Sequence, residues 1–300
     1  MAVKVPYKKD LEFDYGVCDE LSPLIRRVIA NNPSAFTFHG SGTYIIGRGN
    51  VAVIDPGPLV PEHIAAIMKA VDGETISHIL ITHTHRDHSP GAEPLKQLTG
   101  AKTYGFGPHG GGKPDMELEE GGDMDFMPDV KISDGDIIEG DGWSVEAIHT
   151  PGHLSNHICF GLREEKTLFT GDHVMGWSTT VVSPPDGDMS SYMTSLEKLL
   201  PLDYHTYWPT HGPAITETKP FVEALIAHRH DRMDQIRGCL ADGPLRIPDM
   251  VKQMYTDVPE FLHPAAARSV FAHILHMRDG GELTSDGSGN EQDLYSLASK

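Results

Sequence analysis

Cysteine and long apolar runs are scarce in this sequence. Cys18, Cys159 and Cys239 are the three cysteines, and they are too scattered for a disulfide framework or a thiolate metal cluster. That usage is typical of a reducing cytosol. No run approaches the ~20 apolar residues of a membrane helix, and the start, MAVKVPYKKDLEFDYGV, has no apolar segment of a secretory signal. We therefore expect a cytoplasmic protein that does not interact with a membrane.

Positive charge is also scarce. The 24 lysines and arginines are outnumbered by 43 acidic residues, giving a formal net charge of −19 over 300 residues. This balance argues against broad electrostatic capture of nucleic acid, although it leaves room for a local basic groove. Hydrophobic residues make up 39% of the chain, which is ordinary for a globular protein with a main domain and a smaller companion.

The first two thirds of the chain alternate between strand and helix patterns. Residues 43–46 and 51–54 read as two strands joined by a turn of glycine and asparagine. Apolar residues then recur at helical spacing from Ile64 to Val71. Further short apolar runs predict strands at 79–81, 145–148, 158–162, 167–169 and near 204–208. A helix with Asp188 or Ser190 as its N-cap precedes the last of them, so the fold class is α/β.

Two segments depart from this alternation. Residues 105–129 are rich in glycine, proline and acidic residues and are expected to be a long loop, either an active-site wall or a disordered insert. After His211 the pattern becomes helical, with helices expected at 220–239, 247–255 and 264–277. We therefore expect a domain over residues 1–218, a small helical domain over 219–285 and a mobile tail over 286–300.

Histidine is abundant, with 18 residues, and four potential metal ligands occur within six positions after the predicted strand at 79–81. They are His83, His85, Asp87 and His88. A single histidine here would be an ordinary surface residue. Four imidazole and carboxylate donors leaving one strand end can instead begin two sites for zinc or a related divalent ion. The order H-x-H-x-D-H therefore predicts a metal centre.

The segment HTHRDH resembles the first signature of the metallo-β-lactamase-fold superfamily of hydrolases. Later signatures of that superfamily follow in order, with TPGH at 150–153, TGD at 170–172 and PTHG at 209–212. The resemblance covers roughly residues 30–215. It implies a four-layer αββα sandwich, with helices outside two packed sheets. No G-x-G-x-x-G follows a strand, so a doubly wound nucleotide-binding sheet is disfavoured.

The resemblance also implies a dinuclear site, with seven ligands that one tetrahedral ion could not use. The first metal would be held by His83, His85 and His153, the second by Asp87, His88 and His211, and Asp172 would bridge both. Two divalent ions, most readily Zn²⁺ with Mn²⁺ or Fe²⁺ as alternatives, would activate a bridging hydroxide as the nucleophile. Asp87 would also orient that hydroxide.

Four other residues are weaker candidates for contact with the ligands or the substrate. Asp55, in the IDPG turn, either supports a ligand or caps its turn. His157 either faces the site or begins the next strand. His109 is a candidate substrate contact, although a solvated loop position is the simpler interpretation. Trp177 follows Asp172 and is a candidate wall of the pocket.

The C-terminal region resembles the small winged-helix domain of the lactamase-beta-like-protein branch of this superfamily. That branch includes a single-strand endoribonuclease. Winged helices that bind DNA use a basic recognition helix, whereas residues 219–300 hold nine basic and twelve acidic residues. We therefore expect this domain to have a structural or substrate-covering role.

Three functions remain open from the sequence. The presence of Asp172 and the lack of an export signal argue against a dedicated β-lactamase. We favour a hydrolase of a small carbonyl substrate, which is a thioester, an ester, a lactone or, promiscuously, a β-lactam. The alternative is a phosphodiesterase that cleaves single-stranded RNA. A metal-binding or winged-helix interaction protein without turnover is the third, and the intact set of seven donors disfavours it.

Overall fold

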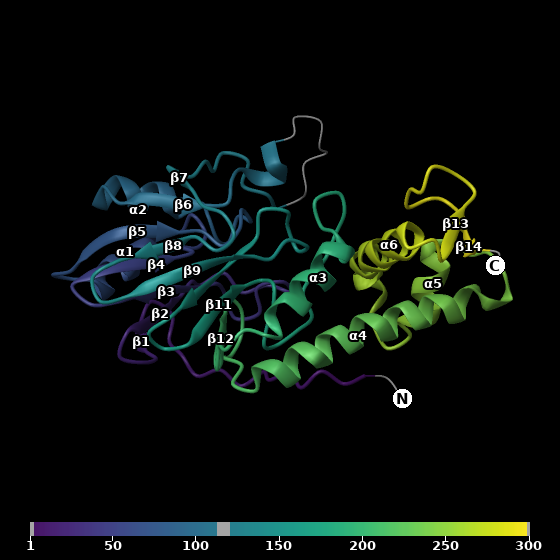
Figure 1. Cartoon of the computed structure of the whole chain (residues 1–300), viewed down its shortest axis with the longest axis horizontal. Helices are drawn as coiled ribbons and strands as arrows, with labels where there is room; N and C mark the ends of the chain where they lie inside the picture. The colour runs from purple at the N-terminus through teal and green to yellow at the C-terminus, as the bar shows by residue number, and fades with distance from the viewer. Residues whose placement is uncertain (1–2, 113–120, 299–300) are drawn as a thin grey trace.

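A computed structural model of the protein describes residues 3–112 and 121–298, and within them the chain forms two large sheets (Figure 1). The strands of the first sheet lie side by side in chain order, antiparallel up to β4 and parallel from β4 onward. They are β1 (Cys18–Glu20), β2 (Ile25–Ile29), β3 (Gly42–Ile46), β4 (Asn50–Ile54), β5 (Thr75–Leu80), β6 (Lys102–Gly105) and β7 (Val130–Lys131).

The second sheet has the order β12-β11-β10-β9-β8. Its pairs are antiparallel except for β11 with β12, which run parallel. A parallel pair needs a crossover, and α3 supplies it between these two strands. The strands are β8 (Ile137–Glu139), β9 (Ser144–His149), β10 (Ile158–Leu162), β11 (Thr167–Gly171) and β12 (Thr206–Pro209).

Alternation along the strands produces four layers. In β3, Tyr44 and Ile46 point into a core shared with Phe160 of the second sheet, because successive side chains of a strand face opposite ways. Ile45 points to the outer face and packs in the same cluster as Ile67 of α1. The helices on this face are α1 (Pro61–Ala70) and α2 (Ala92–Thr99), and α3 (Met189–Leu199) covers the other sheet. Helices therefore lie outside two packed sheets, as expected.

The C-terminal region packs on the outer face of the second sheet through a long helix, α4 (Thr218–Cys239), which runs from beneath β12 to the last helices (Figure 1). The remaining elements are α5 (Ile247–Met254), α6 (His263–Asp279), β13 (Leu283–Ser285) and β14 (Tyr295–Leu297), with short 3-10 turns at 109–112, 240–242 and 260–262. In the described residues, no helix is long and apolar enough to cross a membrane.

One expectation needs correction, and another is only partly covered by the described residues. Residues 286–298 are not a mobile tail, because β14 pairs with β13 and the buried ring of Tyr295 packs in the core of the helical region. This hairpin spans the expected boundary between residues 285 and 286, and the domain boundaries stay predictions. The expected loop at 105–129 lies partly outside the described residues, at 113–120. Its described part contains the turn at 109–112, and the next strand begins at Val130.

Candidate metal centre

The candidate ligands all follow strand ends at one edge of the sandwich. His83, His85, Asp87 and His88 follow β5, and His153 lies between β9 and β10. Asp172 directly follows β11, and His211 follows β12. The ends of strands from both sheets therefore bring residues from four distant parts of the sequence to one place.

Two glycines allow the chain to pass closely behind this edge. Gly152, in TPGH, has φ +137°, and a Cβ at its position would lie 2.3 Å from the main chain of Tyr192 in α3. Gly171, in TGD, has φ +50°, and a Cβ there would lie 2.6 Å from the ring of His157. A larger residue at either position would clash with these neighbours, so the motif glycines have a steric cause.

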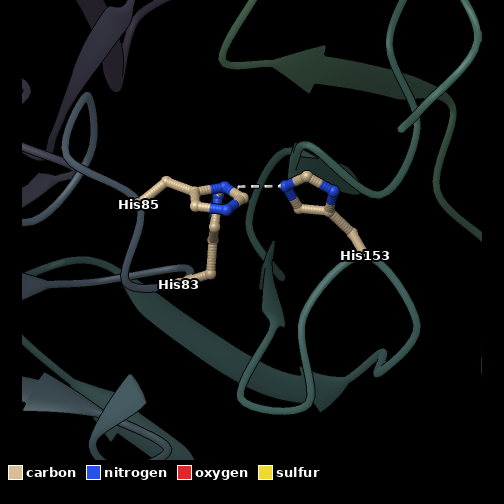
Figure 2. Close-up of side chains that lie close together, drawn as sticks. All are labelled: His83, His85 and His153. Atoms are coloured by element: carbon tan, nitrogen blue, oxygen red, sulfur yellow. Dashed lines mark hydrogen bonds between the residues drawn. The ribbon is translucent and has the colours of Figure 1, made fainter. Parts of the chain in front are cut away.

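The seven side chains form three overlapping groups whose ligand atoms lie within 4.8 Å of one another. The first group approaches from two loops, and its rings converge (Figure 2). Another group has one carboxylate and two imidazoles, and the last shares one histidine with each of these two groups and adds Asp172. The groups are His83, His85 and His153; His83, His88 and Asp172; and Asp87, His88 and His211.

Hydrogen bonds at Nδ1 fix the tautomers of two rings in the first group. His153 Nδ1 lies 2.6 Å from the carbonyl oxygen of Val181, which can only accept a proton. The hydroxyl of Thr82 donates to Asp55, so its oxygen accepts from His83 Nδ1 at 3.0 Å. Both rings therefore carry hydrogen on Nδ1 and present a bare Nε2.

Two rings of the other groups are held in the same way. His88 Nδ1 donates to the carboxylate of Asp55 at 2.8 Å, and His211 Nδ1 donates to the carbonyl of Gly40 at 3.1 Å. In the described residues, His88 Nε2 and Asp172 Oδ1 are buried without a hydrogen-bond partner. These orphaned atoms point into the cluster.

This donor set fits divalent cations. His83 Nε2 and His153 Nε2 each lie 3.0 Å from His85 Nδ1, so three ring nitrogens converge where at most one hydrogen bond could satisfy them. A cation accepts several lone pairs at once, which hydrogen bonding between neutral rings cannot do. Supporting groups that direct a second ring nitrogen inward are typical of metal-binding histidines.

The charges in the cluster balance when protons occupy two of the rings. Burial opposes a charge on His211, but Asp172 and Asp87 outweigh it and raise the pKa of His211 to about 10. The same carboxylates raise the pKa of His88 against its burial. The pKa values of Asp87 and Asp172 are lowered, since the positive rings outweigh burial. Burial and then His153 lower the pKa of His85 to about 3, so that ring is neutral and ready to ligate.

The structure places two of the weaker candidates directly behind the ligands. The carboxylate of Asp55 accepts hydrogen bonds from the main chain and hydroxyl of Thr82, which precedes the HTHRDH segment, and from His88, which ends it, so it ties the two ends of this stretch together. His157 does not belong to any of the three groups. Its Nδ1 contacts Thr150, and its Nε2 accepts from the main-chain N–H of Asp172 at 3.2 Å.

The other two weaker candidates lie around the cluster. His109 is buried, contrary to the solvated position expected for it, because its Nδ1 contacts the hydroxyl of Thr84 at 2.9 Å. Its ring centre is 6.3 Å from that of His85. Trp177 is half-buried and stacks on Phe38 with ring centres 4.7 Å apart.

Sequence reasoning missed groups that contact the ligands from distant segments. The hydroxyl of Ser41 donates to Asp87 Oδ2 at 3.1 Å, and the segment His39–Gly42, HGSG, could have drawn attention to it. The main-chain carbonyls of Gly40 and Val181 contact His211 and His153. A main-chain contact leaves no signal in residue type.

Comparison with known proteins agrees with this fold and these motifs. Residues 37–211 match the family profile described as the metallo-beta-lactamase superfamily, and residues 247–290 match the beta-lactamase associated winged helix domain. The chain therefore belongs to the metallo-beta-lactamase superfamily, and it is a hydrolase of that family with a C-terminal winged-helix domain.

Several individual proteins are similar to it. A beta-lactamase-like protein 2 homolog of Drosophila melanogaster is 33% identical over 91% of this chain and 94% of its own length. An atrochrysone carboxyl ACP thioesterase of a Cryptosporiopsis species is 32% identical over 74% of this chain and 64% of its own length. The crystal structure of a beta-lactamase domain protein from Burkholderia ambifaria shares the fold, with a TM-score of 0.81 at 18% identity over 96% of both chains.

Proposed function

We propose that this chain is a dinuclear metal-dependent hydrolase of a small carbonyl substrate, and that the substrate class is a thioester. One observation carries the proposal: two groups of three ligand atoms are linked by a third group that contains Asp172 and one histidine from each. Five imidazoles and two carboxylates suit Zn²⁺ best, with Mn²⁺ or Fe²⁺ as alternatives.

In the proposed division, His83, His85 and His153 hold one ion, and Asp87, His88 and His211 hold the other. The contacts of Asp172 support its role as the shared ligand. Its Oδ2 lies 3.6 Å from His88 Nε2 and 3.7 Å from His153 Nε2, and its Oδ1 lies 3.4 Å from His211 Nε2. One carboxylate therefore borders both sets of rings.

When bound, the two ions supply an activated water at neutral pH and polarise the scissile carbonyl. Asp87 is the group of this chain that orients the attacking water. Its side chain is 23% exposed against 10% for Asp172, so it is the more accessible of the two carboxylates. The hydroxyl of Ser41 donates to its Oδ2 at 3.1 Å, which helps to keep the carboxylate in one orientation.

The choice of substrate class has weaker support. A relative 32% identical to this chain is named a thioesterase, and a thioester offers a carbonyl that the proposed site can attack. The net charge of −19 disfavours RNA, because a polyanion is repelled by an acidic surface. The chain has three free cysteines, and we propose a reducing, cytoplasmic location for it.

The test is a parallel screen of the purified full chain loaded with Zn²⁺. The substrates are an acyl-pantetheine thioester, a lactone, a chromogenic cephalosporin, a simple phosphodiester and single-stranded RNA. We expect two bound zinc ions per chain and hydrolysis of the thioester. Asp87→Asn should lower kcat/KM by about 100-fold or more, because it weakens an acceptor that orients the water.

The matched control is Asp129→Asn, which changes an exposed carboxylate paired with Lys96 in the same way. It should leave the kinetics unchanged. A protein with one bound ion or none would refute the dinuclear site. Cleavage of RNA that falls steeply with added salt, without thioesterase activity, would favour the nuclease alternative instead.

A further inference from the structure

Arg229 of α4 is a buried cation in the contact region between the helical domain and the metal-binding edge. Its side chain is 1% exposed, and its guanidinium lies 5.0 Å from the ring centre of Tyr192 in α3. Nη2 donates to the main-chain carbonyl of Thr180 at 2.6 Å. In the described part of the chain, the arginine–carboxylate pairs all involve other arginines.

This arrangement is unfavourable for stability alone. A charge taken out of water without a carboxylate partner loses hydration that one hydrogen bond and one aromatic face replace only in part. Nε of Arg229 is also buried without a partner in the described residues. An apolar side chain would suit the surrounding core better, so the carbonyl that Arg229 holds is the informative feature.

The segment around Thr180 contacts two of the proposed ligands. The hydroxyl of Thr180 donates to the main-chain carbonyl of Asp172 at 2.8 Å. The carbonyl of the next residue, Val181, accepts the Nδ1 hydrogen of His153 at 2.6 Å. Arg229 is therefore linked to Asp172 through one intervening residue, Thr180, and to His153 through two, Thr180 and Val181.

The segment has no regular secondary structure to hold its carbonyls, although side chains such as Val182 anchor it in the core. Residues 172–188 contain neither helix nor strand, so no regular ladder of main-chain hydrogen bonds fixes the carbonyls. The side chain of Val181 is 39% exposed and gives limited anchorage by packing. A planar guanidinium that donates in a fixed direction can set the orientation of the peptide at Thr180 and, through it, the next carbonyl.

We propose that Arg229 is a positioning residue for metal binding, acting through Thr180 and Val181 on Asp172 and His153. The inference rests on the proposed function, since it presumes that these two residues are ligands. It assigns the helical domain a definite task. α4 completes the support of the metal-binding edge from outside the sandwich.

The first test measures Zn²⁺ affinity by competition with a chromogenic chelator, at a temperature well below unfolding. Arg229→Gln should bind Zn²⁺ about 10-fold more weakly, within the range found when groups behind a metal ligand are removed. Arg229→Lys should recover part of the loss, because an ammonium can still donate to Thr180. The matched control is Arg237→Gln on the same helix, where the arginine is exposed and paired with Glu282; its affinity should not change.

A second readout needs no metal. In the zinc-free protein, the Nδ1 hydrogen of His153 should be protected from exchange in nitrogen-filtered NMR spectra, because Val181 accepts it. Arg229→Gln should speed that exchange at least several-fold and leave the Nδ1 hydrogen of His211, which contacts Gly40, unchanged. If Arg229 only stabilised the fold, the substitution would change the exchange rates at His153 and His211 alike.

The outcomes are distinguishable. Arg229→Gln with a lowered melting temperature but unchanged zinc affinity and unchanged exchange at His153 would overturn the inference. If that variant does not fold, Arg229→Lys and Thr180→Val decide, since the latter removes only the hydroxyl that donates to Asp172; unchanged affinity in both would overturn it. A wild-type protein that binds no Zn²⁺ would instead refute the proposed function.

Discussion

Asp55 offers a sharp test of how the ligands are held, because one carboxylate serves four donors. Oδ1 accepts from the N–H of Thr82, and Oδ2 accepts from the hydroxyl of Thr82, from His88 Nδ1 and, at 3.4 Å, from the hydroxyl of Thr210. The residue is buried, with φ +46°. Asparagine tolerates that backbone conformation better than most residues, so Asp55→Asn changes the charge and the acceptors while keeping shape and φ.

The expected effect follows from the two orientations of the amide. If the amide nitrogen faces Thr82, two donors, the amide and the main-chain N–H, oppose each other and a hydrogen bond is lost. If the amide nitrogen faces His88, the ring must carry its hydrogen on Nε2 instead of Nδ1, and that hydrogen prevents Nε2 from binding a cation. Losing one hydrogen bond to a charged group lowers the free energy of unfolding by about 2 kcal/mol. Disturbing a group behind a ligand should weaken zinc binding by about 10- to 100-fold.

Zinc affinity by chelator competition and urea unfolding of the zinc-free protein measure the two effects separately. Asp129→Asn is the control, because Asp129 also accepts hydrogen bonds from the N–H and the hydroxyl of a threonine, Thr103. Asp129 is exposed, and its hydrogen bonds do not involve any histidine of the cluster. Equal zinc affinity for Asp55→Asn and Asp129→Asn would show that tautomer control by Asp55 does not govern binding.

Three further predictions follow. Burial lowers the pKa of His63 to about 4, so the unfolded chain binds more protons than the folded chain between pH 6.5 and about 4. This difference contributes about 3 kcal/mol to the free energy of unfolding above pH 6.5, and the contribution is lost as the pH falls through that range. Urea unfolding of zinc-free His63→Gln should show a flatter pH dependence than wild type, and parallel curves would contradict this. Chelation should lower the free energy of unfolding by about 3 to 4 kcal/mol for each bound ion, relative to protein in Zn²⁺ at 100 to 1,000 times its Kd. Asp172→Asn should respond less in calorimetry, and an equal response would count against Asp172 as a ligand. Phe160→Ala should reduce stability by about 3 to 5 kcal/mol in urea unfolding, because Phe160 is fully buried between the sheets, whereas a loss under 1 kcal/mol would mean that this core repacks freely.

The fold could be predicted from local patterns where burial dictates residue type. The run Val51–Ile54 ends at Asp55 and forms β4, and the spacing from Ile64 to Val71 became α1 with its apolar face on the sheet. Strand β1 escaped prediction because it has three residues, two of them acidic, and β2 because Arg26 and Arg27 interrupt its apolar pattern. Both arginines are buried, and they pair with Glu74 and Asp19. A buried ion pair looks polar in sequence.

The C-terminal hairpin was missed for a related reason. Residues 286–293 are polar and rich in glycine, a composition typical of mobile tails. Yet Asp293 accepts hydrogen bonds from the main-chain N–H groups of Gly289 and Asn290, and Tyr295 is buried against the helices. Composition describes the average of a segment, so it does not reveal that a single residue such as Tyr295 anchors it in the core.

What the sequence determined by itself was the chemistry available. Seven donors of the right types stand after strand ends, in motifs that identify the family, because strand patterns and ligand types are local properties. Only the tertiary structure decided which nitrogen of each ring faces inward and which groups behind the rings hold them. Those choices depend on contacts such as His211 with Gly40, 171 residues away, and His153 with the carbonyl of Val181. Main-chain groups are present at every position, so only their placement in space makes them specific.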